Sequence, residues 1–368
     1  DPELEQEWGW TERYATQPEI LSYAQHVADR YDLKKDITFE TRVTRAIYDE
    51  DTERWTIYTD TGEAISTQYY IMATGCLSVP KEPDIEGSDS FEGPTYVTGR
   101  WPHEGVDFTG QKVGVIGTGS SAIQSIPVIA EQAAELVVMQ RTPNFVVPAH
   151  NRPLGADEIA EAKARYPALR AQARDEAAGF LGSTAATETT ALDTPEAERT
   201  AEFQKRWDRG GLSFMASYPD IGMVMEANDM AAEFIRAKIR ERVDDPETAE
   251  RLCPKGYPAG AKRLCVDTDY FETYNRGHVH LVDLKSTPIE RITAIQVSWT
   301  TSSAMAGAAL ILTACGEEPG AEQVAGPKPV NPLYPEARYG EPMPPGGRKP
   351  EKKRVHCSSV SIAIAHHW

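Results

Sequence analysis

Two periodicities divide the first 75 residues of the chain. The segment Thr16-Gln-Pro-Glu19 has the form of a capping box with proline in the first turn, and apolar residues then recur on one helical face as far as about Tyr31. From residue 37 onward, apolar and polar positions alternate in runs at 37–43, 46–49, 55–59, 64–67 and 69–74. The pattern predicts one amphipathic helix followed by a small antiparallel β meander.

A short apolar strand, a glycine loop, a helix and a second strand come next, as in a βαβ unit. The strands are expected at 112–116 and 135–139, and the helix at 121–134. Gly117 permits the tight turn, Gly119 lets the backbone approach a pyrophosphate, and free amides at the helix start bind phosphates. The sequence therefore predicts a dinucleotide site formed by Gly117, Thr118, Gly119, Ser120, Ser121 and Gln124.

The residues after the second strand indicate which dinucleotide binds. An NAD site usually carries an acidic residue there for the ribose hydroxyl, but this chain has Gln140-Arg141-Thr142. A guanidinium favours a 2′-phosphate, so Arg141 and Thr142 predict NADP as the cofactor. The alternative interpretation of Arg141 is a solvated surface side chain.

The block from about 156 to 250 is highly charged, and its amphipathic spacing predicts helices at 157–166, 196–207 and 228–243. Glycine and proline then punctuate residues 253–263, which indicates an extended or turning backbone. His278 and His280 alternate on an expected strand at 279–284 and would share one face, as metal ligands can. Because no third ligand is obviously placed to join them, a structural role is favoured and no metal site is predicted.

Length and charge restrict the class of protein. The chain has 368 residues, enough for about two domains with sizeable cores. Its formal charge of −18 argues against nucleic acid or an anionic membrane surface as the partner, and no apolar run is long enough to span a membrane. Five cysteines without C-x-x-C spacing suit a reducing compartment, so we expect a cytoplasmic protein. The chain lacks an initial Met, which predicts a fragment.

Residues 91–102, Phe-Glu-Gly-Pro-Thr-Tyr-Val-Thr-Gly-Arg-Trp-Pro, carry the most specific motif. They resemble the linker fingerprint of Baeyer–Villiger monooxygenases, F-x-G-x-x-x-H-x-x-x-W-P, which in that family precedes the NADPH-binding Rossmann unit. Val97 stands where the family has His. In the family this His is tied to domain movements that couple flavin reduction to oxygenation. Valine can neither donate a hydrogen bond nor titrate, so the departure is a chemical one.

The resemblance implies an α/β fold with two parts. One is a Rossmann-type NADP domain at 103–284 with a helical insertion at about 156–250, which in the family supplies part of the substrate wall. The other is a partial FAD-binding domain at 1–90 that carries the β meander, joined by the linker at 91–102. Met72-Ala-Thr-Gly75 resembles the family's A-T-G signature, and Val43 matches the position whose backbone meets the FAD adenine. Sheet core is the alternative role for both.

The same resemblance gives roles to the basic pair in Gly260-Ala-Lys262-Arg263. It implies that Lys262 faces the 2′-phosphate of NADP beside Arg141, and that Arg263 faces the flavin. A fixed guanidinium in that place stabilises the negative charge that develops on oxygen, which makes Arg263 the expected catalytic residue. In an extended backbone neighbouring side chains point to opposite sides, as these two roles require.

The implied function is that of an NADPH- and FAD-dependent monooxygenase that oxidises a ketone to an ester or lactone with dioxygen. Trp101-Pro102 favours this chemistry over N- or S-oxygenation. That alternative stays open, as does a catalytically silent NADP-binding remnant. The resemblance covers about residues 1–293, so we expect the N-terminal FAD loop and the C-terminal return of the FAD domain to be missing.

The composition changes after about Ala294, where the resemblance stops. Nine of the chain's 26 prolines fall within 319–350, and only 304–315 is apolar enough to pack. Such a segment buries too little apolar surface to offset the entropy of ordering it. We therefore expect residues 285–368 to be a linker and an aberrant, disordered tail, from a frame-shifted or mis-spliced end or from a divergent extension.

Overall fold

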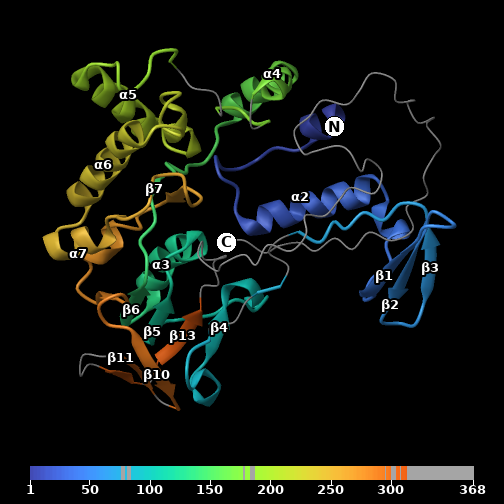
Figure 1. The fold of residues 1–368 in the computed structure, drawn as a ribbon, viewed down its shortest axis with the longest axis horizontal. Coiled ribbons are helices and arrows are strands. Elements are labelled where there is room, and N and C mark those ends of the chain that lie inside the picture. The colour runs from blue at the N-terminus through green and yellow to red at the C-terminus, as the bar shows by residue number, and fades with distance from the viewer. Residues whose placement is uncertain are drawn as a thin grey trace. The chain divides into compact units, whose positions relative to one another are not determined.

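The computed structural model describes residues 1–75, 79–80, 84–176, 179–182, 187–294, 296–299, 304–306 and 308–312. The chain splits into two compact units (Figure 1). The first contains Asp1–Asp32 and the described residues of Thr74–Cys315, and the described part of the second is Leu33–Ala73. The proline-rich stretch at 319–350 lies outside the described residues.

A five-stranded parallel sheet forms the centre of the first unit. Its order is β4-β13-β5-β6-β9. These strands are β4 (Thr95–Val97), β5 (Lys112–Ile116), β6 (Glu135–Gln140), β9 (Val279–Asp283) and β13 (Ala308–Leu312). From β5 the chain proceeds through β6 to β9 on one side, while β13 lies on the other side. The carboxyl end of β5 is therefore a topological switch point, where doubly wound sheets bind their ligands.

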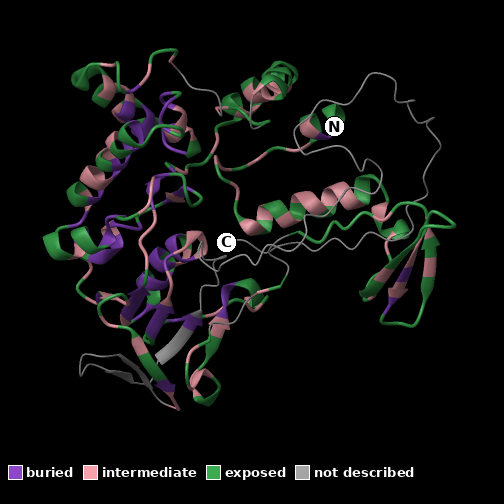
Figure 2. Ribbon diagram, in the orientation of Figure 1, coloured by how far each residue is buried: buried purple, intermediate pink, exposed green. Residues whose placement is uncertain are grey.

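Both faces of this sheet are covered, which explains the unbroken apolar run of β6. Leu136 and Val138 point to the face where helix α3 (Ser120–Gln132) packs with Ile123 and Ile126, all in one buried cluster. Val137 and Met139 belong to a second apolar cluster on the opposite face. Figure 2 shows purple along most of β5 and β6 and on part of α3. A strand buried on both faces needs no polar alternation.

Helices make up the block between β7 (Val146–Pro148) and β8 (Cys265–Asp267), which pair in parallel with each other. The helices are α4 (Ala156–Asp175), α5 (Glu196–Arg209), η4 (Leu212–Ala216), α6 (Met225–Arg242) and α7 (Pro246–Leu252). Aromatic rings join α5, η4 and α6, with Phe203, Phe214 and Phe234 mutually 5.5–5.7 Å apart between centroids. Ala231, Ile235 and Ile239 extend the core along α6. The block is helical, as the periodicity predicted.

Helix α4 is longer than the sequence predicted, because it continues through Pro167 to Asp175 instead of ending at Tyr166. Proline has no N–H to donate to the carbonyl four residues earlier, which is that of Lys163. That carbonyl instead accepts a hydrogen bond from Gln6 Nε2 at 3.0 Å, in helix α1 (Pro2–Glu7). Lys163 Nζ returns a bond to the Gln6 carbonyl at 2.6 Å. A tertiary contact thus compensates for the missing helical one.

The second unit is the predicted antiparallel meander, in the order β1-β2-β3. Its elements are η1 (Leu33–Asp36), β1 (Val43–Asp49), β2 (Arg54–Thr59) and β3 (Ala64–Thr67). Two predicted strands are wrong. Residues 37–42 are not a strand, since Glu40 has φ +52° and turns the chain. Residues 69–74 form no ladder, and Ile71 and Met72 are 78% and 69% exposed. A strand needs a neighbour to receive its backbone hydrogen bonds.

The remaining elements lie in the first unit. They are α2 (Gln17–Arg30), η2 (Ser88–Ser90), η3 (Thr98–Arg100), η5 (Glu272–Asn275), β10 (Ile289–Thr293), β11 (Gln296–Trp299) and β12 (Ala304–Ala306). Strands β10, β11 and β12 form a small antiparallel sheet. The five-stranded sheet takes in strands on both sides of the 103–284 range, and residues 289–312 of the expected tail contribute strands, because β13 gains two parallel neighbours, β4 and β5.

Candidate functional site

The glycine loop has the geometry that phosphate binding requires. Gly117 has φ +103°, a left-handed conformation that favours glycine, and its N–H donates to the Met139 carbonyl at 2.9 Å. Gly119 caps α3 without a side chain, so no side-chain cap occupies the first-turn amides of Ser120 and Ser121. Gln124 donates back to the Ser120 carbonyl at 3.1 Å, within its own helix. The open helix start can therefore receive an anion.

The loop after β6 is hydrogen-bonded to the glycine loop. Thr118, which is 5% exposed, donates from Oγ1 to the Thr142 carbonyl at 3.1 Å. Asn144 Nδ2 donates to the Thr118 carbonyl at 2.6 Å. Asn144 was not predicted as a site residue, since its only signal in the sequence is its place two residues after Thr142. These bonds bring two of the predicted cofactor-binding positions, Thr118 and Thr142, to one place.

At the end of β6 the side chain of Gln140 is buried and that of the next residue, Arg141, is exposed. Gln140 is 2% exposed, and its Nε2 donates at 2.8 Å to the carbonyl of Arg251 in α7. Its Nε2 is thus engaged within the protein. Arg141 is exposed. NAD sites usually carry an acidic residue at this position. Here the exposed side chain is that of Arg141, which is cationic.

The segment 254–264, which carries Lys262 and Arg263, is held against the loop after β6 by two hydrogen bonds, one from within it and one from Cys265 directly after it. The Tyr257 hydroxyl donates to the Pro143 carbonyl. Cys265 N–H donates to the Phe145 carbonyl at 3.1 Å, where β8 begins beside β7. Two segments more than 110 residues apart in sequence therefore run side by side.

Asn228 in α6 fixes the middle of this segment. Its Oδ1 accepts from the Ala259 N–H and its Nδ2 donates to the Ala259 carbonyl, both at 2.8 Å. Nδ2 also donates to the Ile221 carbonyl at 3.0 Å. Asn228 is 4% exposed, so its amide satisfies three buried backbone groups that have no strand partner. The helical periodicity around Asn228 does not indicate this role.

Lys262 and Arg263 themselves are both exposed. Lys262 Nζ lies 5.0 Å from the centroid of the Tyr257 ring. The Arg263 carbonyl accepts a weak hydrogen bond from Cys265 Sγ at 3.6 Å. The two side chains are presented on a backbone that is fixed on either side, and their assignment to different cofactors stays a prediction.

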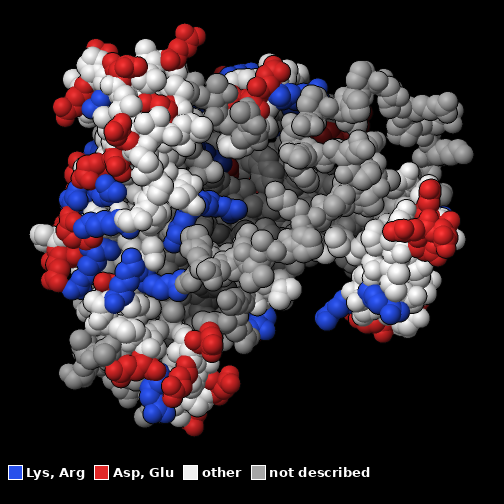
Figure 3. Space-filling view, in the orientation of Figure 1, with Lys and Arg blue, Asp and Glu red and all other residues white. Residues whose placement is uncertain are grey.

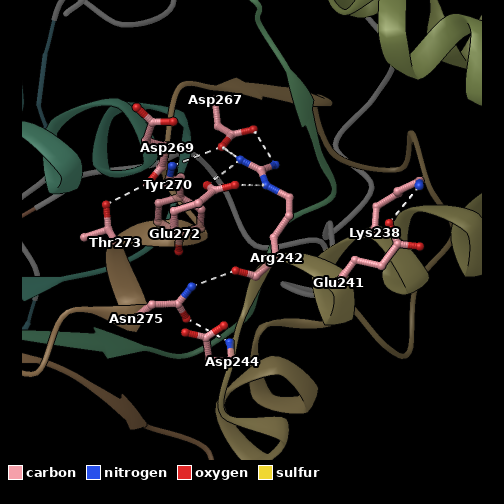
Figure 4. A network of polar contacts seen from close by, with 10 residues as sticks. All are labelled: Lys238, Glu241, Arg242, Asp244, Asp267, Asp269, Tyr270, Glu272, Thr273 and Asn275. Atoms are coloured by element: carbon pink, nitrogen blue, oxygen red, sulfur yellow. Dashed lines mark hydrogen bonds and ion pairs between the residues drawn. The ribbon is translucent and has the colours of Figure 1, made fainter.

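A partly buried ionic network fixes the chain just after Arg263 (Figure 4). Arg242, at the end of α6, bonds both the Asp267 carboxylate of β8 and the Glu272 carboxylate of η5. Asp267 also accepts from the Tyr270 N–H at 3.0 Å. Burial raises the pKa of the Glu272 carboxyl, but the Arg242 guanidinium outweighs it and holds that pKa below its ordinary value. The network connects β8, η5 and α6.

The charge pattern separates Lys262 from other basic residues of the helical block. Figure 3 shows Lys and Arg side chains close to Asp and Glu side chains over the helical block. Arg240 pairs with Glu233, Arg251 with Glu247, and Lys255 with Glu250. Within the described residues no carboxylate forms an ion pair with Lys262; its contact is the Tyr257 ring. Its positive charge is therefore not neutralised by a neighbouring acid.

The linker motif packs on the sheet on both of its faces. Trp101 contacts Tyr96 and Phe108, with ring centroids 5.6 and 6.1 Å away, beside the main core. Val97 is 8% exposed and lies in the second apolar cluster with Met139 and Ile292. A valine suits these surroundings, and a histidine there would lack water.

The other candidate positions are spread over the structure. Val43 begins β1 in the second unit and is 40% exposed. His278 makes a hydrogen bond at 2.9 Å with the Ala130 carbonyl, a structural contact, and His280 is exposed. In the described ranges no group of three or more His, Cys, Asp or Glu side chains is placed to hold a metal ion. His366 and His367 lie outside the described residues. The helices of the described part include none that is long and apolar enough to span a bilayer.

Comparison with known proteins adds to this geometry. Residues 2–162 match the model of a family described as pyridine nucleotide-disulphide oxidoreductase. Three curated bacterial relatives are each 41% identical over about 295 residues. They are a 2-oxo-Δ3-4,5,5-trimethylcyclopentenylacetyl-CoA monooxygenase of Pseudomonas putida, a Baeyer–Villiger monooxygenase of Pseudooceanicola batsensis and a phenazine N-monooxygenase of Lysobacter antibioticus, matched by 78%, 80% and 80% of this chain.

The chain is a homologue of the Baeyer–Villiger monooxygenases. Solved structures of such enzymes share its fold. A steroid monooxygenase bound to NADP is 48% identical, with a TM-score of 0.82 over 85% of this chain and 59% of that one. An enzyme called OTEMO, in complex with FAD and NADP, is 39% identical, with a TM-score of 0.81 over 84% of this chain and 59% of that one. The α/β fold expected from the resemblance is confirmed.

The match is partial in length. The chain spans 53–54% of the three curated relatives. Homology with Baeyer–Villiger monooxygenases therefore establishes the kinship of the matched region, and the activity of the whole protein is a separate question.

Proposed function

We propose that this chain is the NADPH-binding part of a flavin-dependent Baeyer–Villiger monooxygenase, which oxidises a ketone to an ester or lactone with NADPH and dioxygen. The observation that carries the proposal is the joining of three segments at the end of β5. Thr118 of the glycine loop bonds Thr142, and Tyr257 bonds Pro143. The cations Arg141 and Lys262 lie on the segments that these bonds connect.

The residues present fit a dinucleotide phosphate. The turn at Gly117 and the uncapped start of α3 supply backbone donors for the pyrophosphate. Arg141 and Lys262 are exposed and cationic, as a 2′-phosphate requires, and the neighbouring Gln140 is turned inward to Arg251. The set Gly117, Thr118, Gly119, Ser120, Ser121, Gln124, Arg141, Thr142 and Lys262 is therefore our proposed NADP site.

Arg263 is our proposed catalytic residue. Flavin, when bound, supplies the redox chemistry that joins NADPH to dioxygen. The guanidinium of Arg263 would stabilise negative charge developing on an oxygen atom. The neighbouring β8 is fixed by Arg242, which restricts the backbone next to Arg263. We also propose, from homology with FAD-binding relatives, that the Val43 backbone contacts the adenine of FAD.

The substrate class follows from the relatives. Their names refer to a cyclic oxo-acyl-CoA, to Baeyer–Villiger oxidation and, in one case, to a phenazine nitrogen. We propose a ketone as the substrate and dioxygen as the co-substrate. N-oxygenation is the second candidate, favoured by the phenazine N-monooxygenase at equal identity. We propose the cytoplasm as the location, because Cys253 and Cys265 are buried cysteines that form no disulfide, which suits a reducing compartment.

Calorimetric titration of the 368-residue chain with NADPH and with NADH tests the cofactor assignment. We expect tighter binding of NADPH, by about 1.5–3 kcal/mol, through charge-assisted contacts to the 2′-phosphate. Arg141→Ala should remove most of that difference. Equal affinities for the two nucleotides in the unaltered chain would reject the assignment.

The division of roles between Lys262 and Arg263 has its own test. Lys262→Ala should weaken NADPH binding and leave NADH binding unchanged, whereas Arg263→Ala should leave the ratio of the two affinities unchanged. Lys255→Ala is a matched control, since it removes a lysine of the same segment that pairs with Glu250. A loss of NADPH preference in Arg263→Ala would contradict the proposed roles.

The oxygenation itself is tested on a protein that restores the full length of the relatives around this chain. Incubation with NADPH, FAD and a panel of ketones and aromatic nitrogen heterocycles should yield esters or lactones. N-oxides without esters would favour the second candidate. NADPH binding without any product would favour the silent remnant.

A further inference from the structure

Tyr257 contacts both segments that carry the proposed 2′-phosphate cations. Its hydroxyl donates to the carbonyl of Pro143, two residues after Arg141. Its ring faces the ammonium of Lys262, with Nζ 5.0 Å from the ring centroid. The two cations are 121 positions apart in the sequence, and one side chain connects their segments.

The ring is itself held in place. Phe145 packs against it edge to face, with 5.5 Å between centroids. The Arg236 guanidinium lies 5.8 Å from the Phe145 centroid, so each of the two contacting rings also has a cation over its face. Burial raises the pKa of the Tyr257 phenol above its ordinary value. The bond to Pro143 and the contact with Phe145 thus fix the Tyr257 ring that Lys262 faces.

A lysine side chain is flexible, and ordering it on a ligand opposes binding. An aromatic face attracts an ammonium and restricts where it lies. A carboxylate partner would restrict it too, but would neutralise the charge that a phosphate needs. Among the described residues Lys262 has the ring and no carboxylate. Tyr257 therefore orders the cation and leaves its charge available.

We propose that Tyr257 is a positioning residue for nucleotide specificity, which holds Lys262 over its ring in the place where the 2′-phosphate of NADPH binds. The proposal rests on the function proposed above. It acts through Lys262, so Tyr257 itself need not contact the nucleotide. Removing the ring should weaken binding of NADPH and not that of NADH, which has no 2′-phosphate.

Calorimetric titration of the 368-residue chain with each nucleotide measures this effect. Tyr257→Leu should raise the Kd for NADPH by about twofold to fivefold, the range of an exposed cation–π contact, and leave the Kd for NADH unchanged. Tyr257→Phe keeps the ring and loses the bond to Pro143. It should retain most of the preference for NADPH. Equal weakening of both nucleotides by Tyr257→Leu would show a merely structural role and overturn the proposal.

A double-mutant cycle gives a sharper test. In the Lys262→Ala background, Tyr257→Leu should have no further effect on NADPH binding, because the group it positions is gone. In the Lys255→Ala background the effect of Tyr257→Leu should persist in full, since that lysine pairs with Glu250. Additive effects of Tyr257→Leu and Lys262→Ala would overturn the proposal.

A variant that changes only the electron density of the ring tests the cation–π contact even if Tyr257→Leu does not fold. Replacing Tyr257 by 4-cyanophenylalanine keeps the shape and weakens the negative potential of the ring face. NADPH should then bind more weakly than it does to Tyr257→Phe. Identical Kd values for these two variants would reject the cation–π contact. Equal binding of NADPH and NADH by the unaltered chain would reject the proposed function itself. A clear preference for NADPH without coupling between Tyr257 and Lys262 would reject only the role of Tyr257.

Discussion

Arg242 binds the carboxylate of Asp267 through two hydrogen bonds, from Nη1 at 3.2 Å and from Nη2 at 2.7 Å. The Asp267 side chain is completely buried, and that of Arg242 is 18% exposed. Asp267 ends β8 only four residues after Arg263. This ion pair therefore attaches the backbone next to Arg263, the proposed catalytic residue, to the end of α6.

Loss of Arg242 should destabilise the first unit strongly. Arg242→Met would leave the Asp267 charge buried and unpaired, which costs about 3–5 kcal/mol in the free energy of unfolding. The control is Arg240→Met, which removes a half-exposed arginine paired with Glu233 and Glu250 and should cost at most about 1 kcal/mol. Urea unfolding of both variants measures the difference. Similar losses of unfolding free energy in the two variants would show that the buried ion pair stabilises the protein no more than the exposed one.

Stability should fall in acid partly through Glu250. Hydrogen bonds from Arg240 and Lys255 lower the pKa of this carboxyl from 4.5 to about 2. Between those two values the unfolded chain binds a proton that the folded chain does not, so the contribution is complete above about pH 4.5 and is lost as the pH falls toward 2. The side chain is 45% exposed, so solvent screening limits the effect to well under about 1 kcal/mol. Glu250→Gln should show a shallower decline of the urea midpoint between pH 5 and pH 3 than the parent chain; parallel curves would contradict this.

Asn228 should be needed for the conformation of the 254–264 segment. Asn228→Leu has a similar volume but leaves the Ala259 N–H and the Ala259 and Ile221 carbonyls without their partner, at about 2–4 kcal/mol in the free energy of unfolding. Binding of NADPH should also weaken, because Lys262 follows Ala259 by three residues. Gln204→Leu, which removes an exposed amide bonded to Asp208, is the control and should change stability by less than about 0.5 kcal/mol. Thermal unfolding and nucleotide titration report the two effects, and an unchanged NADPH affinity in a destabilised variant would separate the segment from the site.

Restoring the family's histidine at Val97 should destabilise the protein. Val97→His would place an imidazole among Met139 and Ile292, where its nitrogens lack water, at about 1–3 kcal/mol. Burial disfavours the charged imidazole and lowers its pKa in the folded state, so the stability of this variant should fall further as the pH drops below about 6.5. Val128→His makes the same change on the exposed face of α3 and should be nearly neutral. Equal stabilities of the two variants at pH 5.5 would show that the cluster around Val97 admits water.

Much of the fold followed from local patterns in the sequence. The glycines of the βαβ unit have one structural solution, since a tight turn with positive φ at Gly117 requires glycine. The helices at 196–207 and 228–243 were also predicted, because their apolar positions repeat with the helical period. Family membership was equally visible in the motif at 91–102, which the comparisons with known proteins confirm.

What the sequence could not give were the partners of residues far apart in the chain. Strands β4 and β13 are short, and their place beside β5 depends on which parallel neighbour accepts their hydrogen bonds. The strand expected at 69–74 had the right pattern and gains no ladder.

In the candidate site, too, some features depend on local sequence and others on tertiary packing. The sequence by itself determined its chemical groups: the phosphate loop, and the cations Arg141, Lys262 and Arg263. Only the tertiary structure decided how they are held, through Tyr257 on Pro143, Asn228 on Ala259 and Arg242 on Asp267. The reason is physical. Periodicity and turn chemistry act over a few residues, whereas a hydrogen bond between buried groups more than 20 residues apart exists only after packing has brought their segments together.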